Sequence, residues 1–164
     1  MFLKSYTELP LGFDEVRATM LRRPNHLLEG LAAVVERNGE RLLVEVGLGV
    51  HGHQVSRSAW LDAGEPVTTD RVASLPFWLR VENNQQLFPS LEGSIEAAWL
   101  GHDRTHLALT AQYDPPFGPF GDVADRALLH RVAEAVARRF LETVAERLAA
   151  DSLASSSGPR RKIS

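Results

Sequence analysis

Hydrophobic and polar positions alternate with a period of two through the middle of the chain. In the segments 91–99 and 107–113 every second residue is apolar or small, and mostly polar side chains fill the positions between them. One apolar face and one mixed face is typical of an antiparallel sheet that is covered on one side only. Shorter β-prone runs predict further strands at 1–9, 55–61, 67–72 and 77–81.

A turn signal lies upstream of most of these strands. Asn38 and Gly39 separate two β-prone runs, and such a pair predicts a two-residue hairpin with both residues at positive φ. The outgoing run, 42–50, has an apolar face, and Gly47 and Gly49 lie on the other face. We expect these glycines to mark a bend that curls the sheet around a core.

Helical periodicity appears near both ends of the chain. Apolar spacing predicts a helix over 13–21, after a Pro-Leu-Gly break, and a second short helix over 26–31. A much longer helix is predicted from Asp122, which suits an N-cap, to about Ala149. At ~40 Å it must lie along the whole sheet. Its apolar positions recur every four residues, at Ala124, Leu128, Val132, Val136, Phe140, Val144 and Leu148.

These elements predict an α+β fold. A curved antiparallel β-sheet wraps around a long C-terminal α-helix, and two short helices follow the first strand. We expect one domain over residues 1–150, a size that buries roughly 70% of the surface of the unfolded chain. The segment 151–164 is polar and basic and has nothing to bury, so it is predicted to be a disordered tail.

Composition narrows the classes of function. The chain has 164 residues, a formal net charge of -3 and no cysteine. This charge gives no basis for binding nucleic acid or an anionic membrane, and no apolar run approaches the ~20 residues of a membrane span. The lack of cysteine excludes disulfides, thiolate metal sites and a cysteine nucleophile. With no secretory signal pattern in 1–10, we expect a cytoplasmic protein.

Polar residues in the predicted strands are candidates for a catalytic or ligand-binding role. Tyr113 ends an apolar strand just before a proline-rich turn, which suits either a proton donor or a core tyrosine bonded to the backbone. A strand arginine that faces a cavity could anchor a carboxylate, but the neighbouring apolar residues favour solvent exposure of Arg57, Arg71, Arg80 and Glu82. Ser58 and Ser94 lack the partnered histidine and aspartate that a nucleophilic serine needs.

The histidines supply weaker candidates. His51 and His53 are two residues apart and could both ligate a metal, but no third ligand is evident, so we expect no metal site. His130 and Glu134 have the i,i+4 spacing of a shared ligand site or of a surface pair. His102 and His106 straddle a predicted hairpin turn.

Several segments of the C-terminal half resemble those of a known superfamily. They are Leu75-Pro76-Phe77-Trp78, Leu87-Phe88-Pro89, the strand 105–113, the proline- and glycine-rich run 113–121, and Leu128-Leu129-His130-Arg131-Val132-Ala133. Together with the element order they are similar to the START-like, helix-grip superfamily, above all to its bacterial SRPBCC and polyketide cyclase/dehydrase-like members. The resemblance implies an apolar cavity between the sheet and the long helix. It implies no universal catalytic residue, because members differ in whether they catalyse a reaction.

We therefore expect the chain to bind a small hydrophobic molecule, such as a lipid, a polyketide or an aromatic metabolite, without a cofactor. Small residues opposite the helix, such as Ala97 and Ala111, would leave space for it. Two alternatives stay open: a cofactor-free cyclase, dehydrase or isomerase, and an interaction domain or homodimer with a filled core. The residues expected to line the cavity are Val46, Leu48, Phe77, Leu79, Val81, Ile95, Ala97, Leu109, Ala111, Tyr113, Phe117, Leu128, Val132 and Val136.

Overall fold

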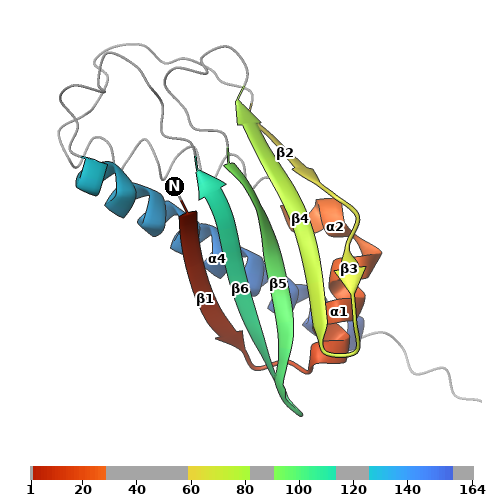
Figure 1. Cartoon of the computed structure of the whole chain (residues 1–164). Coiled ribbons are helices and arrows are strands. Elements are labelled where there is room, and N and C mark those ends of the chain that lie inside the picture. Colours follow the sequence, from red (N-terminus) through yellow and green to blue (C-terminus); the bar gives the residue numbers. More distant parts are fainter. Residues whose placement is uncertain (1, 29–58, 82–90, 114–125, 157–164) are drawn as a thin grey trace, which may run out of the picture.

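The chain forms an antiparallel sheet with helices on one of its faces (Figure 1). The computed structural model describes residues 2–28, 59–81, 91–113 and 126–156. In this part of the chain six strands pair in the order β1-β6-β5-β4-β2, and β3 also pairs with β4. The elements are β1 (Phe2–Leu9), α1 (Phe13–Arg22), α2 (Pro24–Leu28), β2 (Ala59–Ala63), β3 (Val67–Thr68), β4 (Val72–Val81), β5 (Leu91–Gly101), β6 (Arg104–Tyr113) and α4 (Arg126–Ser156).

Alternation along the central strands decides which face the helices cover. Every second residue is buried, and the residues between them are half-buried or exposed. A single hydrophobic cluster joins the buried face, here called the inner face, to α1, α2 and α4. Each fully buried leucine or phenylalanine contributes about 1.5–3 kcal/mol. The predicted α+β, helix-grip arrangement is confirmed. The buried residues of β4, β5 and β6 are Ala73, Leu75, Phe77, Ile95, Ala97, Thr105, Leu107, Leu109 and Ala111.

The two short helices follow β1, as predicted. α1 buries Phe13, Val16 and Met20, whose spacing places them on one face of the helix. α2 begins at Pro24, two residues before the predicted start, because a proline suits the first turn, where its missing N–H has no intrahelical partner. The predicted end of this helix, 29–31, lies outside the described residues.

The prediction of one strand over 67–72 is wrong. β3 contains only Val67 and Thr68, and the chain then turns back into β4. The hydroxyl of Thr69 accepts a hydrogen bond from the N–H of Val72 at 3.1 Å, and the N–H of Thr69 donates to the carbonyl of Val72 at 2.7 Å. Threonine favours strands, but its hydroxyl can also close a tight turn.

The end of β2 and the start of β4 also differ from the predicted strand boundaries. Asp62 and Ala63 lie beyond the predicted strand over 55–61 but belong to β2. Pro76 lies inside β4. It stands at the gap between the part of β4 that pairs with β2, which reaches Phe77, and the part that pairs with β3. Its carbonyl accepts the N–H of Gly64 at 2.8 Å. Because the N and the carbonyl of a strand residue point to the same side, the missing N–H of Pro76 faces this interruption and costs no ladder bond.

The C-terminal helix is longer than predicted. α4 ends at Ser156, whereas we expected it to end near Ala149, so 151–156 is helical and not part of a tail. Ser152 is buried, and its hydroxyl donates a hydrogen bond to Glu15 Oε1 of α1. The end of α4 therefore has a tertiary partner that its own composition does not reveal.

A second set of contacts ties α4 to α2. The guanidinium of Arg147 donates to the carbonyls of His26 and Leu27, at 3.3 and 3.1 Å, near the C-terminal end of α2. Carbonyls in the last turn of a helix lack intrahelical donors as a rule, and an arginine side chain can satisfy them. The imidazole Nδ1 of His26 also lies 3.7 Å from a carboxylate oxygen of Asp151. Together these contacts fix the C-terminal half of α4 against α1 and α2.

Four sequence predictions fall outside the described residues and stay predictions. They are the hairpin at Asn38 and Gly39, the strand over 42–50, the N-cap at Asp122, and the tail over 157–164.

Candidate functional site

Cross-strand rows organise the inner face of the sheet. Phe77 of β4, Gly93 of β5 and Ala111 of β6 are successive partners, and Leu3 of β1 completes the row. β4 and β6 both finish at the same end of the sheet, which we call the distal end. The opposite end is the proximal end. Away from the distal end, the next two rows hold Leu75, Ile95 and Leu109, then Ala73, Ala97 and Leu107.

The proximal end of the inner face is filled by side chains. α1 and α2 lie there because β1 finishes at this end, and the C-terminal half of α4 packs against both helices. Large apolar side chains from all three helices join the same cluster as the sheet residues. The packing of these side chains accounts for the proximal end of the inner face without a bound ligand. The helical contributors are Phe13, Val16, Met20, Leu27, Leu28, Phe140, Leu141, Val144 and Leu148.

The side of α4 that faces the sheet differs from the predicted stripe. Four residues rotate a helical position by about 40° beyond a full turn, so a strict four-residue repeat drifts around the helix. Val136 is accordingly half-buried. The buried side follows mixed spacings of three and four, which keep it in one line. It consists of Ala133, Ala137, Phe140, Leu141, Val144, Leu148 and Ser152.

His130 and Glu134 lie at the N-terminal end of this sheet-facing side. His130 precedes Ala137 by about two helical turns and Leu141 by about three, which places it on the same line. Its Nε2 lies 3.2 Å from Oε1 of Glu134, and the two side chains are 38% and 50% exposed. These exposures agree with the surface pair that the sequence suggested. Helix geometry places the pair on the side of α4 that faces the sheet, beyond the packed core.

Apart from the half-buried Val136, the predicted cavity residues divide between the core and side chains that the structure does not describe. Phe77, Ile95, Ala97, Leu109 and Ala111 are buried in the core cluster. The positions of Leu79 and Val81 continue the inner face of β4 toward the distal end, by the alternation of the strand. The side chains of Leu79, Val81, Tyr113, Leu128 and Val132 lie outside the described part of the chain, as do Val46, Leu48 and Phe117 altogether.

Those remaining polar candidates that the structure describes lie away from the inner face. His102 is exposed in the β5–β6 turn, and His106 stacks on Tyr6 with ring centroids 6.0 Å apart. The guanidinium of Arg71 lies 5.2 Å from the ring centroid of Trp99. Residues 51–58 and Glu82, and the side chain of Arg80, lie outside the described residues. Within the described ranges these groups do not converge on a shared site.

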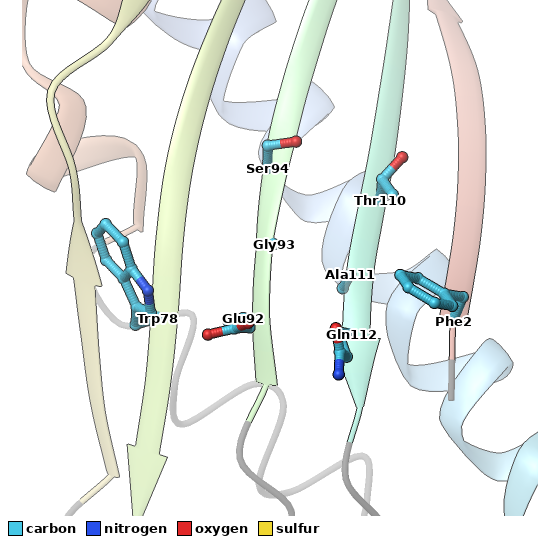
Figure 2. A pocket seen from close by; sticks show the side chains of 8 residues that line it. All are labelled: Phe2, Trp78, Glu92, Gly93, Ser94, Thr110, Ala111 and Gln112. Atoms are coloured by element: carbon cyan, nitrogen blue, oxygen red, sulfur yellow. The ribbon is translucent and has the colours of Figure 1, made fainter.

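A groove on the opposite, outer face of the sheet was not predicted. It has a volume of about 360 Å³ and crosses four strands, from β4 to β1 (Figure 2). Figure 2 shows its aromatic and polar side chains on the side of the strands away from α4. We call it the outer-face groove. Its lining residues are Phe2, Trp78, Glu92, Gly93, Ser94, Thr110, Ala111 and Gln112.

Backbone geometry in the floor of the outer-face groove requires glycine. A Cβ at Gly93 would lie 2.3 Å from the carbonyl oxygen of Thr110 and 2.8 Å from Cα of Ala111. The approach of β5 to β6 at this point is therefore possible only without a side chain. The alternation in 91–99 signalled the outer residues of β5, but their alignment with β1 depends on a pairing between distant segments.

Membrane and metal features can be assessed for the same residues. None of the helices in the described part has the length and apolarity to cross a membrane. Among the described residues, no three histidine or acidic side chains gather as metal ligands would.

Comparison with known proteins gives structural matches only. No family model and no curated protein matches the chain. A conserved protein from Geobacillus kaustophilus is 12% identical with a TM-score of 0.47, over 90% of this chain and 95% of that chain. An aromatase/cyclase from a Streptomyces species is 11% identical with a TM-score of 0.48, over 97% and 99%. Norcoclaurine synthase from Thalictrum flavum is 10% identical with a TM-score of 0.40, over 91% and 86%. At this level of similarity none of them carries an argument about function.

Proposed function

We propose that the chain binds a small, largely apolar molecule between the distal inner face of the sheet and the N-terminal half of α4. A change in side-chain size along α4, together with small residues on β5 and β6, supports this. On α4 the large buried side chains begin at Phe140 and continue toward the proximal end, whereas the described buried positions that precede Phe140 are Ala133 and Ala137. In the sheet row that begins at Phe77, β5 and β6 contribute only Gly93 and Ala111. Small side chains on both layers leave volume that a ligand can fill.

The position of α4 on the sheet agrees with this placement. α4 packs chiefly against β1 and β6, whereas α1 packs against β5. The inner faces of β4 and β5 beyond Phe77 thus lie away from the strands that α4 contacts most closely. The sequence resemblance to START-like proteins points to the same region, because it implies a cavity between sheet and helix.

His130 and Glu134 favour a second function for the same region. The carboxylate of Glu134 can orient the imidazole, and a positioned imidazole can exchange a proton with an enol or phenol. The chain would then be a cofactor-free isomerase or cyclase acting on the apolar ligand. If so, the wild-type chain accelerates deuterium exchange at the acidic carbon of benzoylacetone in D₂O, and His130→Gln and Glu134→Gln abolish the acceleration. Exchange at the buffer rate in the wild type would exclude this function and leave the binding proposal intact.

Titration with 8-anilinonaphthalene-1-sulfonate tests the binding proposal. We expect saturable binding of one probe molecule per folded chain, with a cooperative thermal transition as the check that the chain is native. Val136→Trp, on the flank of the sheet-facing side, should weaken binding by roughly tenfold. The matched change at an exposed position of the same helix, Arg138→Trp, should leave it unchanged. Equal effects of the two variants, or no saturable binding, would contradict the proposal.

A further inference from the structure

The outer-face groove is built from one cross-strand row. Trp78 pairs with Glu92, Glu92 with Gln112, and Gln112 with Phe2, so the four side chains follow one another across β4, β5, β6 and β1. Trp78 and Phe2 stand at the two ends, 37% and 71% exposed (Figure 2). Two aromatic side chains therefore flank a polar floor.

The floor offers hydrogen-bonding groups that the described part of the chain does not use. Ser94 and Thr110 are partners in the adjoining row and add two hydroxyls to Glu92 and Gln112. Within the described residues, the side chains of all four make no hydrogen bond or ion pair with the protein. A hydroxyl and an amide both donate and accept, and a carboxylate accepts. Such a floor suits a ligand that carries several hydroxyl groups.

Charge narrows the class of ligand. Glu92 and Asp62 belong to the same row, since Asp62 pairs with Trp78, and Glu96 lies on the same face. Lys4, the partner of Thr110, adds a positive charge to this face, but the three carboxylates outweigh it and disfavour a phosphate or a carboxylate ligand. A cation would gain little, because an exposed ion pair contributes only about 0–1 kcal/mol. A neutral ligand with apolar ring faces and polar edges uses both the aromatic walls and the floor.

The length of the groove sets the size of this ligand. Three strand spacings separate β4 from β1, which is roughly 14 Å at about 4.8 Å per spacing. A flat, hydroxylated chain of two or three six-membered rings spans such a length. It can stack a ring face at Trp78 and another at Phe2 while its hydroxyls meet the floor.

We propose that the outer-face groove binds an oligosaccharide of two or three pyranose rings, independently of any ligand at the inner face. Trp78 and Phe2 stack on the terminal rings. Glu92, Gln112, Ser94 and Thr110 bind the hydroxyls between them.

Amide NMR spectra during titration with cellotriose, maltotriose and chitotriose test this proposal. At least one trisaccharide should give saturable shifts at residues 92–94 and 110–112. Trp78→Ala should weaken that binding by roughly tenfold. Trp99→Ala removes an exposed tryptophan of the same sheet outside the groove and should have no effect. Glu92→Ala changes an exposed side chain without touching the core, so it should weaken binding in a chain of normal stability.

Several outcomes would overturn the proposal. One is the absence of saturable shifts with all three sugars. Another is binding that Trp78→Ala and Glu92→Ala leave unchanged. A third is a response of the same amides to tetramethylammonium chloride but to no sugar, which would assign the groove to cations. Self-association that buries Trp78, detected by sedimentation, would assign it to a second copy of the chain. None of these outcomes bears on binding at the inner face.

Discussion

The ring of Phe77 on β4 lies against the ring of Phe140 on α4, with centroids 5.4 Å apart and planes inclined at 32°. Both side chains are buried, and Phe140 lies near the middle of α4. The contact joins the two layers where the filled proximal core gives way to the distal end. It therefore marks the boundary between the part of the inner face that stabilises the fold and the part proposed to bind a ligand.

Loss of this contact should destabilise the chain strongly. Phe77→Ala and Phe140→Ala should each lower the free energy of unfolding by about 3–5 kcal/mol, because each leaves a cavity in the core. The double variant should show a coupling of about 0.5–1.5 kcal/mol. Urea unfolding followed by circular dichroism measures both quantities. Val67→Ala, at an exposed position, serves as the control and should change stability by less than about 0.5 kcal/mol.

A methyl group at Gly93 should also be costly. Gly93→Ala places a Cβ 2.3 Å from the Thr110 carbonyl oxygen, so β5 and β6 must separate, at about 1–3 kcal/mol of stability. Gly101→Ala meets no atom within 4 Å and should be nearly neutral. Thermal unfolding of the two variants provides the comparison. Equal stability of both would show that the approach of the two strands is not as tight as described.

Arg147 should contribute more than an ordinary surface arginine. Arg147→Met keeps the apolar stem but removes the donors to the carbonyls of His26 and Leu27, and should cost about 1–3 kcal/mol. Arg138→Met makes the same change at an exposed position of α4 and should be close to neutral. Equal unfolding midpoints for the two variants would contradict the described role.

Truncation measures how much the C-terminal end of α4 contributes to stability. Removal of 151–164 deletes Ser152 and Asp151, and with them the contacts to Glu15 and His26, and should cost about 1–3 kcal/mol. Removal of 157–164 alone should leave the unfolding free energy unchanged. If the longer deletion also had no effect, the helical end would not stabilise the domain.

Local patterns predicted most of the fold, and tertiary contacts explain where they failed. The alternation in β5 and β6 was sufficient because each strand is buried on one face only. The run 67–72 looked like one strand, since β-propensity does not register a turn closed by the hydroxyl of Thr69. The end of α4 depends on Glu15, far away in the sequence, so composition alone suggested a tail.

The candidate sites were harder to predict than the fold. A strict four-residue repeat rotates slowly around a helix, so it only approximated the buried side of α4. It therefore did not place His130 and Glu134 on the side that faces the sheet. The outer-face groove needs the register of β1 against β6 to bring Phe2 beside Gln112. No local pattern contains that register, because the two strands are about a hundred residues apart.

Native mass spectrometry of the chain purified from the organism that makes it tests the central claim most directly. We predict that the folded chain retains one equivalent of a small apolar molecule, which denaturing solvent releases. Val136→Trp should lose this molecule and Arg138→Trp should keep it. A ligand-free mass for the native chain, together with no binding of 8-anilinonaphthalene-1-sulfonate, would contradict a ligand site between the sheet and α4.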